Sequence, residues 1–259
     1  MFADERQKVI LDLINRQGSV KIQELMEKFE ISKMTVWRDL KTLDEKGLIK
    51  KVHGGAVKLG NVIPPEPAFK EKKVVATQEK QAIAQYAADT YITQGDVIVL
   101  GAGSTLFLMI PFLTQKRLTI LTNGLKVMEY ASKQLTNSEV IASGGFIRQP
   151  ALAFVGSDAK KFFTRYKANT CFLSATSISL GNGIMDPHPL DAEIKAVIRK
   201  ISGKTVLLMD SSKFEKTSMV QTFQIKDIDV LITDNNAPEE IISQIRKTGV
   251  HVDIVEVEK

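Results

Sequence analysis

Residues 31–56 constrain the fold most, because they combine a capped amphipathic helix with a short hairpin. Ser32 is a residue type that caps a helix by accepting a hydrogen bond from an orphan N–H of the first turn. Gly47 is typical of a helix end. Between them, apolar side chains recur at helical spacing, which predicts one buried face; they are Val36, Leu40 and Leu43. Residues 48–55 then predict a short basic hairpin.

The charge of this stretch indicates what the exposed face binds. Residues 31–58 hold seven basic and three acidic side chains, a local charge of +4, whereas the whole 259-residue chain carries only +5. A helix with a polar, basic face followed by a basic hairpin is the arrangement that a winged helix-turn-helix presents to DNA. The alternative is a small helical domain with an ordinary charged surface.

The first turns of such a helix face the base edges in the major groove. Arg38 has two possible roles, reading guanine or gripping phosphate, while Lys33 and Lys41 suit phosphates. Lys50 and Lys51 of the hairpin are expected at the flanking backbone or minor groove. The predicted DNA-binding residues are Ser32, Lys33, Met34, Thr35, Trp37, Arg38, Lys41, Lys50, Lys51 and His53.

Three regions follow from the patterns along the chain. Two amphipathic helices, near residues 5–17 and 22–29, precede the capped helix and complete a winged helix-turn-helix domain over residues 1–58. Pro64, Pro65 and Pro67 predict an extended linker over residues 59–74. Residues 75–259 form the third region, a second domain.

In the third region short apolar strands alternate with helices. This alternation predicts an α/β domain with a mostly parallel, Rossmann-like sheet covered on both faces. The expected strands are 97–100, 118–121, 140–142, 170–174, 205–209, 229–233 and 250–257, and the expected helices are 78–93, one from 104, 125–134, 190–201 and 238–248.

A glycine turn, Gly101-Ala102-Gly103, separates the strand at 97–100 from the helix that begins at Ser104. The first N–H groups of that helix, with the hydroxyls of Ser104 and Thr105, could hold an anion. Ligands in open α/β sheets bind at the carboxyl ends of strands, where this turn lies. The alternative is a tight strand-to-helix turn without a ligand. Small or polar residues follow other strands too, as a shared cleft requires: Asn123, Gly145, Asp210 and Lys213.

The spacing of these motifs resembles the DeoR family of regulators over essentially the whole chain. The residues that carry the resemblance in the first domain are Ser32, Thr35, Arg38, Asp39, Leu40, Leu43, Gly47, Leu48, Ile49, His53, Gly54, Gly55 and Ala56. One departure is Trp37, where that family usually has the first of two arginines. Two placements are open for this indole: against a sugar or thymine methyl, or against the domain itself.

The resemblance implies that residues 75–259 form an effector-binding and oligomerisation domain similar to ribose-5-phosphate isomerase. The effector of this domain would be a phosphorylated sugar or a related metabolite. The resemblance assigns Gly103, Ser104 and Thr105 to the phosphate. Asn123, Gly145, Asp210 and Lys213 would hold the rest of the ligand. Glu193 and Lys195 would face the cleft, although a solvated helix face explains them nearly as well. With Gly101, these are the predicted effector-binding residues.

The expected function is a transcriptional regulator, most simply a repressor of carbohydrate genes, controlled by a phosphorylated sugar. The rival is a sugar-phosphate isomerase fused to a DNA-binding domain. Isomerases of the similar fold carry an acidic motif after a middle strand, whereas residues 174–178 here contain no carboxylate, so we expect no enzyme activity. The sequence contains no G-x-G-x-x-G motif, the pattern that would indicate a nicotinamide cofactor. We therefore expect no cofactor.

Other features limit the remaining classes. The single cysteine, Cys171, and three scattered histidines predict no metal site. No apolar run of about 18 residues is present, so no membrane span is expected. We expect a cytoplasmic homo-oligomer, dimer or tetramer, that binds a double-stranded operator.

Overall fold

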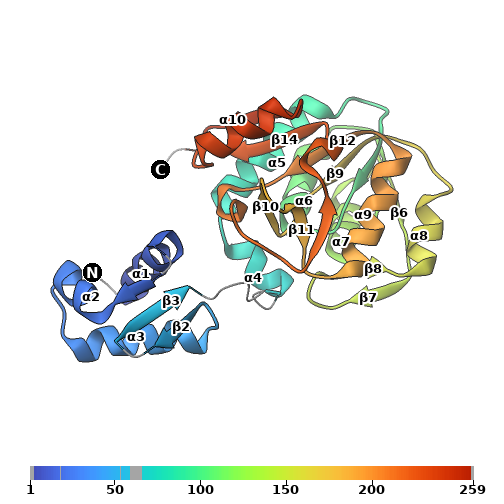
Figure 1. Cartoon of the computed structure of the whole chain (residues 1–259). Coiled ribbons are helices and arrows are strands. Elements are labelled where there is room, and N and C mark those ends of the chain that lie inside the picture. Colours follow the sequence, from blue (N-terminus) through green and yellow to red (C-terminus); the bar gives the residue numbers. More distant parts are fainter. Residues whose placement is uncertain (1–2, 18, 53, 59–65, 258–259) are drawn as a thin grey trace. The chain divides into compact units, whose positions relative to one another are not determined.

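The computed structural model describes residues 3–17, 19–52, 54–58 and 66–257. The chain divides into two compact units, Met1–Pro65 and Glu66–Lys259, which are described here one at a time (Figure 1).

The first unit is a winged helix, as the sequence predicted. Its helices are α1 (Ala3–Gln17), α2 (Ile22–Phe29) and α3 (Lys33–Glu45), and its strands are β1 (Ser19–Lys21), β2 (Ile49–Val52) and β3 (Gly55–Lys58). The strands pair antiparallel in the order β1-β3-β2. The core includes the apolar stripe expected from the sequence, packed against the other helices and the wing. Its almost fully buried members include Ile10, Ile14, Leu25, Val36, Leu40 and Ile49.

Local sequence explains the two ends of α3. The Ser32 side chain accepts a hydrogen bond from the Thr35 N–H at 3.2 Å, which caps the first turn. At the other end Gly47 has φ +65°, a left-handed conformation that glycine adopts without strain. This turn lets the Leu48 N–H reach the Leu43 carbonyl at 2.9 Å, and β2 begins immediately afterwards.

The second unit is built on a seven-stranded sheet, and all its neighbouring strands are parallel. The order is β15-β14-β12-β9-β4-β5-β6. The strands are β4 (Val97–Leu100), β5 (Thr119–Thr122), β6 (Glu139–Ala142), β9 (Ala168–Leu173), β12 (Ser202–Leu208), β14 (Val230–Asp234) and β15 (His251–Val255). This confirms the predicted α/β fold.

Helices cover both faces of this sheet, and alternate residues of each strand serve the two cores. Val99 and Leu121 belong to one core, and Ile98 and Ile120 to the other. Buried residues of α8 (Ser157–Phe163), α9 (Pro189–Ile201) and α10 (Glu239–Lys247) line the first core. The second core is lined by α5 (Thr77–Tyr91), α6 (Ser104–Met109), α7 (Leu125–Gln134) and the 3₁₀ turn Ile110–Leu113.

Several short elements were not predicted. Strands β10 (Ser177–Ser179), β11 (Gly183–Asp186) and β13 (Val220–Phe223) form a second, antiparallel sheet. Strands β7 (Phe146–Arg148) and β8 (Ala153–Val155) form a hairpin. Two further 3₁₀ turns span Ser211–Lys213 and Ile225–Asp227.

The expected extended linker differs from the structure in its last part. Phe69–Val74 forms a short helix, α4, within the second unit. The Phe69 ring is 7% exposed and packs edge-on against Phe107, with the ring centroids 6.1 Å apart. The Glu71 carboxylate accepts from the Ala68 N–H at 2.9 Å. Burial of one aromatic ring therefore outweighs the proline-rich context. Residues 59–65 lie outside the described residues.

Among the described helices, none has the length and apolar character needed to cross a membrane.

Candidate DNA interface and effector site

The predicted DNA-binding side chains of α3 point away from the core of the first unit. Met34 is 71% exposed and Trp37 is 39% exposed. Lys33, Arg38 and Lys41 are exposed, whereas Thr35 is half-buried and its hydroxyl lies 2.9 Å from that of Ser32. Lys41 forms only a loose pair with Glu45, at 3.6 Å. Most of this face is thus available to a ligand.

The wing is joined to α3 by Lys51. The Lys51 N–H donates to the Asp44 carboxylate at 3.0 Å. The Lys51 ammonium lies 4.0 Å from the centroid of the Trp37 ring, a cation–π contact. Lys50, the other predicted wing residue, is exposed, and His53 lies outside the described residues. Sequence reasoning placed Lys51 and Trp37 in the same interface but did not predict this contact.

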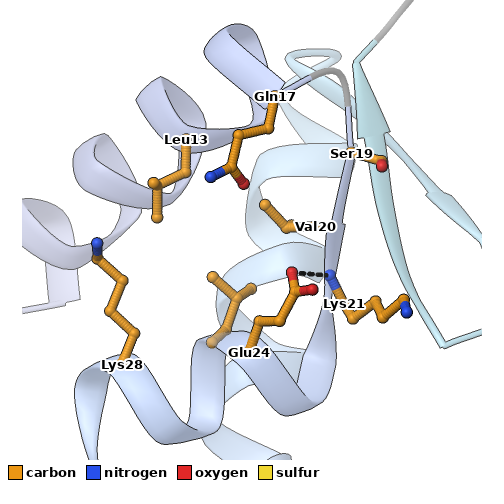
Figure 2. A pocket seen from close by; sticks show the side chains of 8 residues that line it. Leu13, Gln17, Ser19, Val20, Lys21, Glu24 and Lys28 are labelled. Atoms are coloured by element: carbon orange, nitrogen blue, oxygen red, sulfur yellow. Dashed lines mark hydrogen bonds between the residues drawn. The ribbon is translucent and has the colours of Figure 1, made fainter.

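A groove of about 420 Å³ also opens in this unit, between α1, β1 and α2. Figure 2 shows Leu13 and Lys28 on one side of it, and Glu24 accepting from the Lys21 N–H at 3.1 Å. None of the predicted DNA-binding residues lines it. It is therefore separate from the exposed face of α3.

In the second unit the chain order reverses between β4 and β9, which lie side by side. The chain runs from β4 outward to β5 and β6, then returns to β9 and proceeds to β12, β14 and β15. Such a switch point opens a crevice at the carboxyl ends of the two strands. The Gly101 N–H donates to the Phe172 carbonyl at 3.0 Å across this point. A Cβ on Gly101 would lie only 3.0 Å from the Leu173 side chain, so the turn packs closely.

Two of the predicted lysines converge on Ser174, the residue after β9. The Lys195 ammonium donates to the Ser174 carbonyl at 2.6 Å, and the Lys213 ammonium donates to the Ser174 hydroxyl at 2.9 Å. A Cβ on Gly103 would lie 3.7 Å from that of Ser174. The structure thus brings Gly103, Lys195 and Lys213 together at the switch point.

Carboxylates stand beside these lysines. Asp186 of β11 accepts from Lys195 at 2.7 Å and from the Thr222 hydroxyl at 2.7 Å. Asp210 is fully buried, and its Oδ2 atom lies 3.9 Å from the Lys213 ammonium without a hydrogen bond among the described residues. Asp186 was missed by sequence reasoning because β11 carries no periodic signal.

Lys80 of α5 is a third cation at this edge, and it was also missed. Its side chain is buried, and its ammonium donates to the carbonyls of Lys72 at 2.6 Å and Val75 at 2.5 Å. Burial lowers the pKa of Lys80, while Asp210 acts in the opposite direction. Burial also lowers the pKa of Lys213, to about 8. These lysines lie in one another's field, since Lys80 and Lys195 both contribute to lowering the pKa of Lys213.

The predicted phosphate-binding hydroxyls lie in the first turn of α6. The Ser104 hydroxyl is nearly buried and donates to the Lys72 carbonyl at 3.4 Å, so it shares an acceptor with Lys80. The Thr105 hydroxyl is fully buried and has no hydrogen-bond partner among the described residues.

Asn123 holds two loops together. Its Oδ1 atom accepts from the Ala102 N–H at 3.0 Å, and its Nδ2 atom donates to the Phe154 carbonyl at 3.2 Å. The side chain is 3% exposed. These contacts explain, without a ligand, why an asparagine stands at this position, and the sequence did not indicate them.

Gly145 and Glu193 make contacts that the sequence did not predict. A Cβ on Gly145 would lie 2.7 Å from the Val155 carbonyl, so the glycine is required for close packing with β8. Glu193 is exposed and pairs with Lys160 of α8 at 2.6 Å. Lys195, two residues further along α9, points to a different side because successive residues are turned by about 100°. Among the described residues, no hydrogen bond or ion pair joins Glu193 to Lys80, Lys195 or Lys213.

A buried ionic network borders the same edge. Arg148 of β7 binds Asp191 of α9 through Nε at 3.0 Å, and binds Glu66 through Nη2 at 3.1 Å. Glu66 also accepts from Lys72 at 2.9 Å. Although burial alone would raise the pKa of Glu66, Arg148 and Lys72 together lower it. Sequence reasoning missed this network, because its directly bonded partners lie up to 82 positions apart.

A groove of about 710 Å³ lies at the opposite edge of the sheet, among the loops that precede β4, β5 and β6. It contains none of the predicted effector-binding residues.

Comparison with known proteins agrees with both units. Residues 6–60 match the model of a DeoR-like helix-turn-helix domain, and residues 75–235 match that of the DeoR C terminal sensor domain. The chain is 31% identical to an uncharacterized HTH-type transcriptional regulator, YulB, of Bacillus subtilis, covering 100% of this chain and 99% of the relative. It is 32% identical to a lactose phosphotransferase system repressor of Staphylococcus epidermidis, covering 91% and 94% of the two chains.

A ribose 5-phosphate isomerase from Methanocaldococcus jannaschii resembles part of the second unit, with 16% identity, a TM-score of 0.38 and coverage of 52% and 53%. At this score the likeness carries no argument about chemistry. The two family matches and the full-length relatives show that the chain belongs to the DeoR family of DNA-binding helix-turn-helix transcriptional regulators.

Proposed function

We propose that this regulator represses genes of carbohydrate use. Its affinity for the operator would change when a phosphorylated sugar binds its second unit. The name of the staphylococcal relative, a lactose phosphotransferase system repressor, supports the carbohydrate assignment. The operator would contact the exposed face of α3 and the wing. Two-fold symmetry with paired half-sites is the usual geometry for such regulators, so we further propose a homo-oligomer.

The single observation that carries the effector assignment is the placement of Lys213. Its ammonium is largely buried at the switch point of a parallel sheet and is held by Ser174, beside the glycine turn that precedes α6. A buried ammonium is costly unless an anion stabilises it. The charges that act on Lys213 are those of Lys80 and Lys195, which oppose its own, and those of Asp210 and Asp186, which favour it. A bound anion would stabilise all three ammonium groups further.

A route for the response follows from the contacts of α4. This helix begins just after the residues that connect the two units, and its Lys72 carbonyl accepts from both Lys80 and Ser104. A phosphate that bound the Lys80 ammonium and the Ser104 hydroxyl would compete for the donors that hold the end of α4. Ligand binding and the position of α4 would thus be coupled, as a switch requires.

The isomerase alternative rests on Asp186 and Asp210, the carboxylates that the structure adds to this edge. Asp186 is already paired with Lys195, which weakens it as a general base. We therefore propose a sensor without turnover. Conversion of ribose 5-phosphate to ribulose 5-phosphate by the purified chain would contradict this.

Thermal shift measurements against sugar phosphates, the parent sugars and inorganic phosphate test the effector site. At least one sugar phosphate should stabilise the wild-type chain, by about 2.7 kcal/mol at a hundredfold excess over Kd, and its parent sugar should not. Lys213→Met should abolish the shift, whereas Lys200→Met, which removes an exposed lysine of α9, should retain it. Equal stabilisation by the parent sugar, or an unchanged shift in Lys213→Met, would contradict the proposal.

A further inference from the structure

We propose that Met34 and Trp37 form an apolar contact face on α3 that recognises the 5-methyl group of thymine in the operator. Lys51 holds the indole in place for this contact. The inference rests on the proposed function, because it needs an operator. It goes beyond that function by assigning which chemical group of the DNA these two residues distinguish.

The periodicity of α3 places these residues on the outer face. Met34, Trp37, Arg38 and Lys41 stand at i, i+3, i+4 and i+7, positions that share one side of a helix. The opposite side is the buried stripe of Val36, Leu40 and Leu43. The two apolar side chains therefore sit among the basic residues of the helix and cannot reach the core of their own unit.

The exposure of Met34 and Trp37 is the observation that indicates a ligand. Met34 is 71% exposed and Trp37 is 39% exposed, and each large apolar side chain left in water forgoes the free energy that its burial would release. The residues around them are cationic, namely Lys33, Arg38, Lys41, Lys50 and Lys51. A surface that combines a small apolar centre with a cationic surround complements a polyanion with apolar groups in its groove. Duplex DNA has this character.

Lys51 limits how the indole meets the DNA. Its ammonium lies 4.0 Å from the ring centroid and covers one face of the indole. The backbone N–H of Lys51 donates to Asp44, which lies on α3 like Trp37. The covered face is not free to stack on a base. The exposed part of Trp37 and the side chain of Met34 remain available for contact, and both suit a group as small as a methyl.

The major groove offers one such group. Thymine carries a 5-methyl there, whereas cytosine has only a hydrogen at that carbon, and the purines present N7 together with O6 or the N6 amino group. An apolar side chain in the first two turns of a recognition helix therefore distinguishes thymine from the other bases. An arginine at position 37 would instead favour guanine.

Methyl removal from the operator tests the inference directly. An operator is first selected from random duplex DNA with the full chain. Each thymine of the selected site is then replaced by deoxyuridine, which removes only the methyl, and binding is measured by fluorescence anisotropy. We expect at least one position at which uracil weakens wild-type binding about fourfold, the factor that matches burial of one methyl.

Protein variants connect that loss to the two side chains. In Trp37→Ala or Met34→Ala the uracil and thymine operators should bind with equal affinity at the sensitive position. Because each variant is compared with itself on two DNAs, a change in its overall stability does not affect the ratio. Met219→Ala, which removes a 56% exposed methionine of the second unit, should keep the wild-type ratio.

The outcomes separate the two proposals. If the selection enriches a sequence but uracil binds as well as thymine at every position, the methyl-reading inference is overturned and the regulator assignment stands. Full methyl sensitivity in both Trp37→Ala and Met34→Ala overturns it as well. If no sequence is enriched at all, the operator-binding function fails, and this inference fails with it.

Discussion

Arg6 of α1 and Asp39 of α3 form an ion pair inside the first unit, with 2.6 Å between Arg6 Nε and Asp39 Oδ2. Asp39 is 3% exposed and accepts a second hydrogen bond from Gln7 at 3.1 Å. The hydrogen bond and the charge of Asp39 raise the pKa of Arg6. Asp39, the neighbour of the predicted DNA-binding residue Arg38, therefore fixes α3 to α1.

We expect Asp39→Ala to lower the free energy of unfolding of the first unit by about 2 kcal/mol, because buried charged hydrogen bonds lose their acceptor. Trp37 is the only tryptophan of the chain, so its fluorescence during urea denaturation reports on this unit. Glu45→Ala, which breaks an exposed pair with Lys41, is the control and should cost less than about 0.5 kcal/mol. Equal effects of the two variants would contradict the structural role of Asp39.

Arg38→Ala should weaken operator binding about tenfold to a hundredfold, since a lost bidentate contact to guanine costs about 1–3 kcal/mol. Arg38 is exposed and makes no ion pair in the described part of the chain, so its loss should leave stability unchanged. Gel-shift titration with the selected operator measures the effect. Lys247→Ala in the second unit is the matched loss of charge, and an affinity for Arg38→Ala no lower than for that control would exclude Arg38 from the interface.

Effector affinity should depend on pH through Lys213. Burial lowers the pKa of its ammonium to about 8 in the free protein, and a bound phosphate would raise it again. Ligand binding then favours the protonated form, so affinity should be constant from pH 7 to about 8. Above that it should fall, by up to about tenfold per pH unit, until the pKa of the complex is reached. Titration calorimetry from pH 7 to 9.5 measures this, and the control Lys200→Met should keep the bend. A flat profile in the wild-type chain would contradict the assignment.

Asn123→Ala separates a structural role from a ligand-binding one. Because its amide joins the Ala102 N–H to the Phe154 carbonyl, the substitution should destabilise the second unit by about 1–3 kcal/mol. Well below the melting temperature, effector affinity should stay within about threefold of the wild-type value. A loss of more than tenfold with unchanged Tm would instead show that the amide contacts the ligand.

The comparison of sequence and structure shows which information is local. The cap at Ser32, the stop at Gly47 and the hairpin of the wing depend on a few neighbouring positions, and each was predictable. Strands of the parallel sheet were predictable because continuous apolar runs such as Val97–Leu100 identify them. Strands β10, β11 and β13 have three or four residues each, with buried polar side chains such as Asp186 that mask their burial.

The effector site required the tertiary fold. Lys213 and Lys195 could be suggested from strand ends and a helix motif. Nothing in the sequence indicates that Lys80, near the start of α5, is buried against the carbonyls of Lys72 and Val75. The partners of Arg148 are likewise set by the fold, since they lie 43 and 82 positions away. Pairings of this kind depend on which strands become neighbours.

The pairing of Glu66 with Arg148 sets the reach of the DNA-binding unit. Lys58 ends β3, and Glu66 is the first residue anchored in the sensor unit. A fully extended chain between these two residues spans at most about 29 Å. In an oligomer, each DNA-binding unit would therefore stay within this distance of the Glu66 residue of its own chain. The distance between two Glu66 residues would then limit which half-site spacings the protein accepts.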